Sequence, residues 1–256
     1  MKSIDPKTLQ RLPLKPADTF RFRCHKDLAC FNQCCRNLNL FLYPYDVVRL
    51  RKALGISSGR FLDTHVDVVL RDGSHFPDVL LRMADNEART CPFLSDAGCR
   101  VYTDRPDTCR TFPVEQGLHF GEGAEASRIV GFFRPPDFCL GQHEEQAWTL
   151  SSWAEDQEAA GHNRMTARWA AVKALFAKDP WGPAGVGGPK GKMAFMAAYN
   201  IDRFREFVFD SSFLKRYRIK PALVRKLRAS DRELLCFGFE WIRHFVWGLP
   251  SRQIRA

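Results

Sequence analysis

Short apolar runs alternate with polar, loop-forming segments in the first half of the chain. Apolar side chains at helical spacing follow Pro44, a residue that suits the first position of a helix, and the pattern stops at Gly55. This spacing predicts a helix over about 43–54. A second short helix is expected to begin near Ser57 or Ser58, because serine favours the capping position of a helix.

Aliphatic and β-branched residues dominate two further runs, 66–70 and 79–83. The segment 71–74 between them, Arg-Asp-Gly-Ser, has the composition of a tight turn, so the two runs predict a β-hairpin. One more strand is expected at 128–134. The cysteine-bearing stretches before and after these elements lack a clear period and are predicted to be largely loops.

Helical periodicity dominates the chain beyond residue 141. A capping box that begins at Ser152 predicts a long helix to about residue 178, and further helices are expected near 194–209, 212–218 and 231–248. The Gly- and Pro-rich segment 181–192 is predicted to be a flexible loop. Its glycines and lysine do not have the spacing of a phosphate-binding loop, so nucleotide binding is not expected there.

These patterns predict an α+β protein, in which an irregular cysteine-rich metal-binding region with a small antiparallel sheet packs on a helical C-terminal part. Three segments are expected along the chain: an irregular N-terminal arm at 1–20, a cysteine-cluster domain at 21–141 and a helical region at 142–256. A length of 256 residues is enough for one large domain or two modest ones.

Eight of the nine cysteines fall between residues 24 and 139, and two of them are adjacent. Cysteines that only pack a core need no such clustering, so metal ligation and disulfide bonding are the two explanations. The ninth, Cys236, falls in an apolar helical pattern and is expected to be a buried core thiol. The candidate metal ligands are Cys24, Cys30, Cys34, Cys35, Cys91, Cys99, Cys109 and Cys139.

The expected cellular compartment favours metal ligation by the cysteines over disulfide bonding. The N-terminal residues do not have the pattern of a secretory signal, and the sequence has no apolar run of membrane-spanning length. We therefore expect a cytoplasmic protein without a membrane-spanning segment, in which thiols stay reduced.

Thiolates hold zinc ions and iron–sulfur clusters because soft sulfur donors match soft or borderline metals. Eight thiols suffice for two four-ligand sites or for one larger assembly. The chain has no Cys-x-x-Cys, which weighs against a zinc knuckle and a simple ferredoxin. In extended backbone, Cys34 and Cys35 would point to opposite faces and would serve different centres more easily than one. A metal that only staples a loop-rich fold is an alternative role.

The cysteines stand in an ordered set of motifs. These motifs are Cys34-Cys35, then Cys91-Pro92-Phe93-Leu94, then Arg105-Pro106-Asp107-Thr108-Cys109-Arg110-Thr111-Phe112-Pro113, and finally Cys139-Leu140-Gly141. Together they resemble the YkgJ-type cysteine-cluster family, which is described as zinc- or iron-chelating and shares its cysteine region with the flagellin lysine-N-methylases. The resemblance covers roughly residues 20–141. The commonest family pattern begins with Cys-x-x-Cys, whereas the first gap in this chain is five residues.

The resemblance implies a metal-binding protein that holds an iron–sulfur centre or iron, with zinc as the alternative. A second hypothesis is an enzyme that transfers a methyl group from S-adenosylmethionine to a protein lysine, and a redox activity is a further enzymatic reading. The third is a metal-stapled interaction module without catalysis. A protein substrate or partner is expected under the second and third hypotheses. The sequence assigns no catalytic residue.

Arg105 and Arg110 bracket Cys109. Guanidinium groups beside thiolates offset the negative charge and donate hydrogen bonds to sulfur, so we expect both to support the metal centre, with binding of a substrate carboxylate as the alternative. Tyr102 is expected in the core or beside the ligands. His25 adjoins Cys24 and is the one histidine considered as a ligand, although an exposed loop histidine is the simpler reading.

The net charge of +10 is a weak argument for nucleic acid, because two four-thiolate sites, each with one divalent ion, would lower it to about +6. The stretch 213–228 holds seven basic side chains and no acidic one. Such a stretch can bind phosphates or an acidic partner, but it is also typical of a solvated helix face. Nucleic-acid binding by this stretch is therefore a weaker expectation than a solvated helix face.

Overall fold

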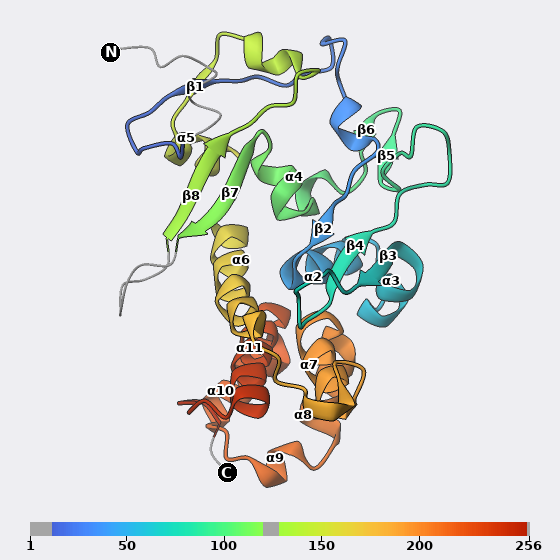
Figure 1. The fold of residues 1–256 in the computed structure, drawn as a ribbon, viewed down its shortest axis with the longest axis vertical. Coiled ribbons are helices and arrows are strands. Elements are labelled where there is room, and N and C mark those ends of the chain that lie inside the picture. The colour runs from blue at the N-terminus through green and yellow to red at the C-terminus, as the bar shows by residue number, and fades with distance from the viewer. Residues whose placement is uncertain (1–11, 120–127, 255–256) are drawn as a thin grey trace. The chain divides into compact units, whose positions relative to one another are not determined.

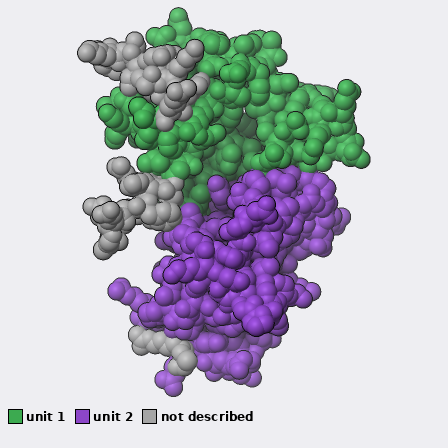
Figure 2. Space-filling view, in the orientation of Figure 1, with its two compact units in different colours: residues 1–40, 83–167 green, residues 41–82, 168–256 purple. Residues whose placement is uncertain are grey.

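The computed structural model of the chain describes residues 12–119 and 128–254. Helices and small antiparallel sheets are mixed (Figure 1), which confirms the predicted α+β class. Two compact units are present, and each is built from two separate stretches of sequence (Figure 2). Unit 1 comprises 1–40 and 83–167, and unit 2 comprises 41–82 and 168–256. The segments 1–20, 21–141 and 142–256 remain a prediction, and residues 1–11 of the expected arm lie outside the described residues.

The strands of unit 1 form separate antiparallel pairs. These pairs are β1 (Phe20–Arg21) with β9 (Ala147–Trp148), β5 (Leu94–Ser95) with β6 (Gly98–Cys99), and β7 (Val114–His119) with β8 (Arg128–Phe133). The strand expected at 128–134 is confirmed as β8, with Val114 opposite Phe133. Its partner β7 has no matching prediction, because Glu115, Gln116 and Gly117 interrupt the apolar pattern.

The helical parts of unit 1 are short. They are the 3-10 turns Gln33–Cys35, Tyr102–Asp104 and Leu140–His143 and the helices α4 (Asp107–Thr111), α5 (Leu150–Asp156) and the first half of α6 (Ala160–Lys173). The prediction of one long helix over 152–178 is wrong. Thr149 caps α5 by accepting a hydrogen bond from Ser152 N (3.1 Å). Glu158 then adopts a left-handed φ of 51°, which separates α5 from α6, and a 3-10 turn (Ala174–Ala177) follows.

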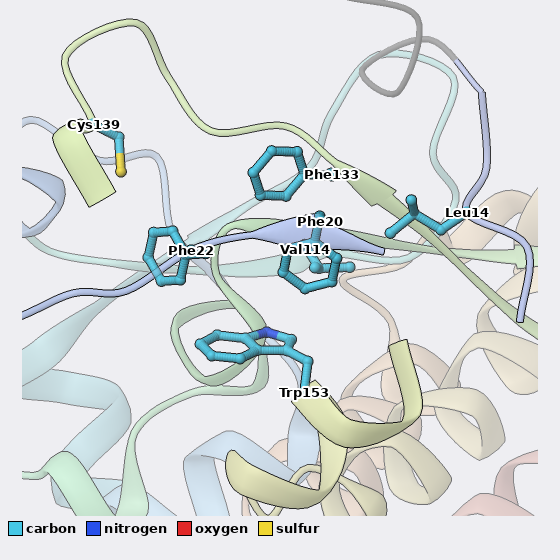
Figure 3. Close-up of a cluster of buried hydrophobic side chains, with 7 residues drawn as sticks. All are labelled: Leu14, Phe20, Phe22, Val114, Phe133, Cys139 and Trp153. Carbon is cyan, nitrogen blue, oxygen red and sulfur yellow. The ribbon is translucent and has the colours of Figure 1, made fainter. Parts of the chain in front are cut away.

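An aromatic cluster forms the core of unit 1 (Figure 3). The Phe20 ring lies 4.9 Å from the Phe133 ring, and Phe22 meets Trp153 edge-on at 5.5 Å, both measured between centroids. Trp153 also donates its indole N–H to the carbonyl of Thr111 (3.0 Å), so the buried polar atom of this ring is satisfied. Figure 3 shows Cys139 at the Phe22 end of the cluster. The core therefore fixes one of the predicted ligand loops.

Unit 2 contains a three-stranded antiparallel sheet in the order β2 (Phe41–Leu42), β4 (Asp78–Leu81), β3 (Val66–Val69). The predicted hairpin is confirmed, because Val66 pairs with Leu81 and Val69 pairs with Asp78. The two predicted helices before it are also confirmed, as α2 (Pro44–Ala53) and α3 (Ser58–His65).

The remaining helices of unit 2 follow closely on one another. They are α7 (Pro189–Tyr199), α8 (Ile201–Asp210), α9 (Phe213–Arg216), α10 (Pro221–Ala229) and α11 (Asp231–Trp247). The helix expected over 194–209 is two helices, because Asn200 ends α7 and caps α8 by accepting from Arg203 N (3.3 Å). The segment expected to be a flexible loop at 181–192 contains a 3-10 turn (Gly182–Ala184) and the first turn of α7. Within the described ranges, no helix is long and apolar enough to cross a membrane.

The core of unit 2 is built around α11, whose apolar face packs on α7, α2 and α8. Leu234, Leu235 and Ile242 are completely buried. A Cβ atom at Gly238 would lie only 2.4 Å from the carbonyl oxygen of Ala197, so glycine is needed where α11 and α7 approach most closely. The expected helix over 231–248 is confirmed, with Ser230 as its capping residue.

Candidate metal centre

Eight of the nine cysteines lie in unit 1, and all nine are within the described residues, where none forms a disulfide. Cys139 is buried and Cys24 is exposed, whereas the other predicted ligands are half-buried. Cys99 lies on β6 and Cys109 on α4, whereas the other predicted ligands lie in loops or in the 3-10 turn Gln33–Cys35. The thiols are therefore held near the surface of the unit and are available for coordination.

Cys34 and Cys35 belong to the 3-10 turn Gln33–Cys35 and not to extended backbone. Asn32 precedes the turn with a left-handed φ of 64°, which bends the chain into it. The two thiols hydrogen-bond to one another, and this bond is the largest cause that raises the pKa of Cys35. The expectation that adjacent cysteines face apart does not apply here, so both sulfurs can serve one centre.

Backbone contacts bring the second cysteine loop to the first. Cys91 N donates to the carbonyl of Cys35 (2.8 Å), and Arg36 forms a β-bridge with Thr90. The β5–β6 hairpin then returns the chain, with Cys99 opposite Leu94. Two loops more than fifty residues apart in sequence are thus joined at the cysteines themselves.

The thiols of the two loops lie close enough to act on one another's pKa values. Burial is the main cause that raises the pKa of Cys91 to about 11, and the neighbouring Cys35 and Cys99 thiols contribute to this rise. Burial also raises the pKa of Cys99, and Cys35 adds to this effect. Thiols that raise one another's pKa resist joint ionisation, and a bound cation reverses that preference. Cys34, Cys35, Cys91 and Cys99 therefore form one sulfur group, in which neighbouring thiols oppose one another's ionisation.

A second sulfur group consists of Cys24, Cys30 and Cys139. Burial is the main cause that raises the pKa of Cys24, and the Cys139, Cys30 and Cys35 thiols raise it further. Cys30 also raises the pKa of Cys139 and accepts a hydrogen bond from Leu140 N (3.2 Å). The effect of Cys35 on Cys24 connects this group to the first one.

Gly141 makes the second group possible. Its carbonyl accepts from Arg23 N (3.0 Å), so the segment after Cys139 runs directly beside the segment before Cys24. A Cβ atom at position 141 would lie 2.6 Å from the carbonyl oxygen of Arg23 and 2.9 Å from the Phe22 ring. Only glycine allows this approach without displacement of the backbone.

The sulfurs are near one another but are not arranged as a finished site. Within the described residues, no three His, Cys, Asp or Glu side chains converge in a geometry that could hold a metal ion. Zinc–thiolate bonds are only about 2.3 Å long, so ligation requires the cysteine loops to move inward. Cys109 lies half-buried on α4, the remaining element that carries a predicted ligand.

Arg105 lies near enough to the first sulfur group to act on Cys99, and its support of a metal centre remains a prediction. Its positive charge opposes the effect of burial on the pKa of Cys99. The guanidinium lies 3.9 Å over the ring of Tyr102 and donates to Gln157 Oε1 (2.7 Å). Tyr102 itself is 61% exposed, so the expectation of a core position for this ring is wrong. The ring supports Arg105 from the solvent side.

Arg110 is 2% exposed and donates to the carbonyls of Gln157 (2.8 Å) and Thr103 (2.6 Å). These bonds tie α4 to the end of α5 and to the 3-10 turn Tyr102–Asp104. In the same network Asp107 accepts from the hydroxyl of Thr166 (2.6 Å). Burial raises the pKa of Asp107 to about 6, against the opposing effects of Thr166 and Arg110. Both charged groups hold the Cys109 helix in position, and direct support of thiolates by Arg110 remains a prediction.

His25 lies between two carboxylates, with Nδ1 3.5 Å from Asp27 and Nε2 3.5 Å from Glu144. Both ring nitrogens thus face acids, and ligation by His25 remains a prediction. Cys236, on α11 in unit 2, is half-buried and accepts a hydrogen bond from Arg168 Nη1 (2.8 Å), so the expectation of a buried core thiol is wrong.

A shallow groove of about 480 Å³ opens beside the cysteine loops. Gln33, Arg36, Arg89 and Phe138 line it, and every lining residue is within four positions of a predicted ligand. Sequence patterns gave no signal for this groove, because its walls come from three separate loops.

This part of the chain thus brings cysteine loops that are distant in sequence together, with thiols that act on one another's pKa. Residues 23–139 match the CxxCxxCC family, whose description is "putative zinc- or iron-chelating domain". The cysteine-bearing part of this chain therefore belongs to the zinc- or iron-chelating cysteine-cluster family, which confirms the resemblance seen in its motifs and supports metal binding by the protein. No curated protein and no solved structure matches the chain significantly.

Proposed function

We propose that the clustered cysteines of unit 1 hold an iron–sulfur centre, with zinc as the alternative metal. The observation that carries the proposal is the junction of the two cysteine loops, in which Cys91 N donates to the carbonyl of Cys35 (2.8 Å) and Cys35 acts on the pKa values of Cys91 and Cys99. With Cys34, this group offers four thiols, which is the number that one cluster or one tetrahedral zinc ion requires.

The second sulfur group supports a larger assembly. Cys24, Cys30 and Cys139 supply three more thiols, and the coupling of Cys24 to Cys35 links them to the first group. The N–H of Leu140 already donates to Cys30 Sγ, and hydrogen bonds to sulfur are one means by which proteins tune such centres. We propose Cys109 as the eighth ligand, carried by α4.

Metal elemental analysis tests the proposal. The full-length protein, purified without oxygen, is expected to contain iron and acid-labile sulfide in similar amounts and to show the visible charge-transfer absorbance of an iron–sulfur centre. A colourless protein that contains zinc and no iron would leave the sulfur site in place but would show that the iron–sulfur assignment is wrong. A protein that takes up neither metal after anaerobic reconstitution would contradict the whole proposal.

Removal of the metal is expected to loosen the cysteine loops selectively. Without a cation the coupled thiols lose their common partner, and the loops need not stay closed. Hydrogen exchange should therefore rise by roughly tenfold or more at 24–35 and 91–99 after treatment with a chelator, whereas exchange in α7 and α11 should be unchanged. Equal loss of protection in all these segments would mean that the metal stabilises the whole chain and not this site.

Methyl transfer to protein lysine, a redox activity and a metal-stapled interaction module remain predictions of the sequence, as do a protein partner and a cytoplasmic location. The groove lined by Arg36, Arg89 and Phe138 is where we expect a ligand of the centre to approach. Calorimetric titration with S-adenosylmethionine separates the first of these hypotheses from the others. Absence of any binding heat would remove it.

A further inference from the structure

A cleft of about 540 Å³ in unit 2 is lined mainly by charged side chains. Its walls come from α2, α8, the end of α10 and the start of α11. The basic residues of the lining are Arg49, Arg51, Lys52, Arg205, Arg228 and Arg232. Among the lining residues of this space of ligand size, six basic side chains outnumber the two acidic ones, Asp202 and Asp231.

The two acids hold the inner arginines in place. Asp231 is bonded to Arg205 Nη2 (2.6 Å) and to Arg51, and Asp202 lies 3.3 Å from Arg51 Nη1. Asp202 is fixed in turn, because it accepts from the backbone N–H of the buried Ser58 (2.6 Å). Arg205 also donates to the carbonyl of Leu227 (3.1 Å). The floor of the cleft is thus a preorganised array of guanidinium groups.

The donors of this array are not all used. Arg51 Nε is buried and makes no hydrogen bond within the described residues. Lys52, Arg228 and Arg232 form no ion pair in the described part of the chain. The guanidinium of Arg228 lies 4.2 Å over the ring of Phe209, which orients it at the rim. An ion network that served only to join helices would not need these additional cations.

We propose that this cleft binds a small ligand with two or more phosphate groups. Guanidinium groups match phosphate oxygens in geometry and charge, and the excess of positive charge suits a multivalent anion. Apolar lining is limited to residues such as Val48 and Ala229, so the phosphates and not an apolar body would supply most of the binding. The cleft lies entirely in unit 2, so this proposal does not depend on the metal centre.

Calorimetric titration of the full-length protein with pyrophosphate tests the inference. Wild-type protein is expected to bind one pyrophosphate, and Arg228→Glu and Arg232→Glu are each expected to weaken binding at least tenfold. Arg225→Glu is the matched control, because Arg225 is an exposed residue of the same helix, carries the same charge and does not line the cleft. It should weaken binding less than threefold.

Three results would overturn the proposal. The first is no binding by the wild type, and the second is an equal loss in Arg225→Glu and Arg228→Glu, which would indicate diffuse attraction to a basic surface. The third is binding of a single-stranded oligonucleotide without binding of pyrophosphate. Because pyrophosphate can also chelate metals, the titration is repeated with Cys91→Ser. Unchanged affinity of this variant for pyrophosphate supports binding in the cleft. Lost affinity would assign the binding to the metal and overturn the proposal. If Arg228→Glu or Arg232→Glu misfolds, Lys52→Ala should still lower the affinity, and unchanged affinity in that variant would also contradict the cleft.

Discussion

Replacement of Cys91 by serine is expected to lower the metal content of the protein roughly tenfold or more. Cys91 joins the two loops of the first sulfur group through its backbone and interacts with the thiols of Cys35 and Cys99. Serine preserves the approximate size and the backbone bond, but its hydroxyl is a poor ligand for soft or borderline metals. The loss is measured as the ratio of metal to protein after anaerobic purification, together with the visible absorbance.

Cys236→Ser is the matched control for this result. Cys236 is also half-buried and has a pKa raised by burial, but it lies on α11 in unit 2 and outside the predicted ligand set. This variant is expected to keep the metal content of the wild type. If both serine variants lose metal equally, the effect of Cys91→Ser would reflect general destabilisation, and the assignment of the site would be wrong.

Replacement of Gly141 by alanine is expected to destabilise unit 1 and to lower its metal content. The new methyl group would lie 2.6 Å from the carbonyl oxygen of Arg23, so the backbone must shift and the Cys139 and Cys24 loops must separate. Overpacking of this kind costs about 1–3 kcal/mol. Thermal and denaturant unfolding measure the stability, and elemental analysis measures the metal.

Gly161→Ala provides the comparison for this variant. Gly161 is the second residue of α6, and a Cβ atom there would meet nothing within 4 Å. Because alanine favours helix over glycine, this variant should gain about 0.5–1 kcal/mol. Full stability and full metal content in Gly141→Ala would show that the close approach of the two cysteine loops is not required.

The elements that the sequence predicted well are those with local signals at both ends. Pro44 and Gly55 delimit α2, and Gly73 in its turn specifies the β3–β4 hairpin. The prediction of one long helix after Ser152 was wrong, because the interruption depends on the backbone of Glu158. Glutamate has no special preference for a left-handed φ. Helix α10 was missed because its basic side chains obscured a narrow apolar face.

The candidate site was predictable in its residues but not in its grouping. Cysteine density identified the candidate ligands, whereas the orientation of Cys34 and Cys35 depends on the left-handed φ of Asn32, which no spacing rule reveals. The division of the thiols into two sulfur groups depends on backbone contacts between distant loops. One such contact is the hydrogen bond from Arg23 N to the carbonyl of Gly141. For the basic cleft of unit 2, the basic stretch 213–228 indicated only Arg228, because the rest of the lining lies outside that stretch.

The interleaving of the two units has a practical consequence for work with fragments. The family match at 23–139 contains all eight clustered cysteines, but it also contains residues 41–82, which belong to unit 2. In that unit α2 and α3 pack on α7, α8 and α11, and all three of these helices lie beyond the match. A recombinant fragment trimmed to the family boundaries would keep every proposed ligand. It would also expose the apolar surface around Val47, Leu50 and Phe61, which is buried in the full chain. We therefore expect the fragment to aggregate unless the downstream helices are supplied.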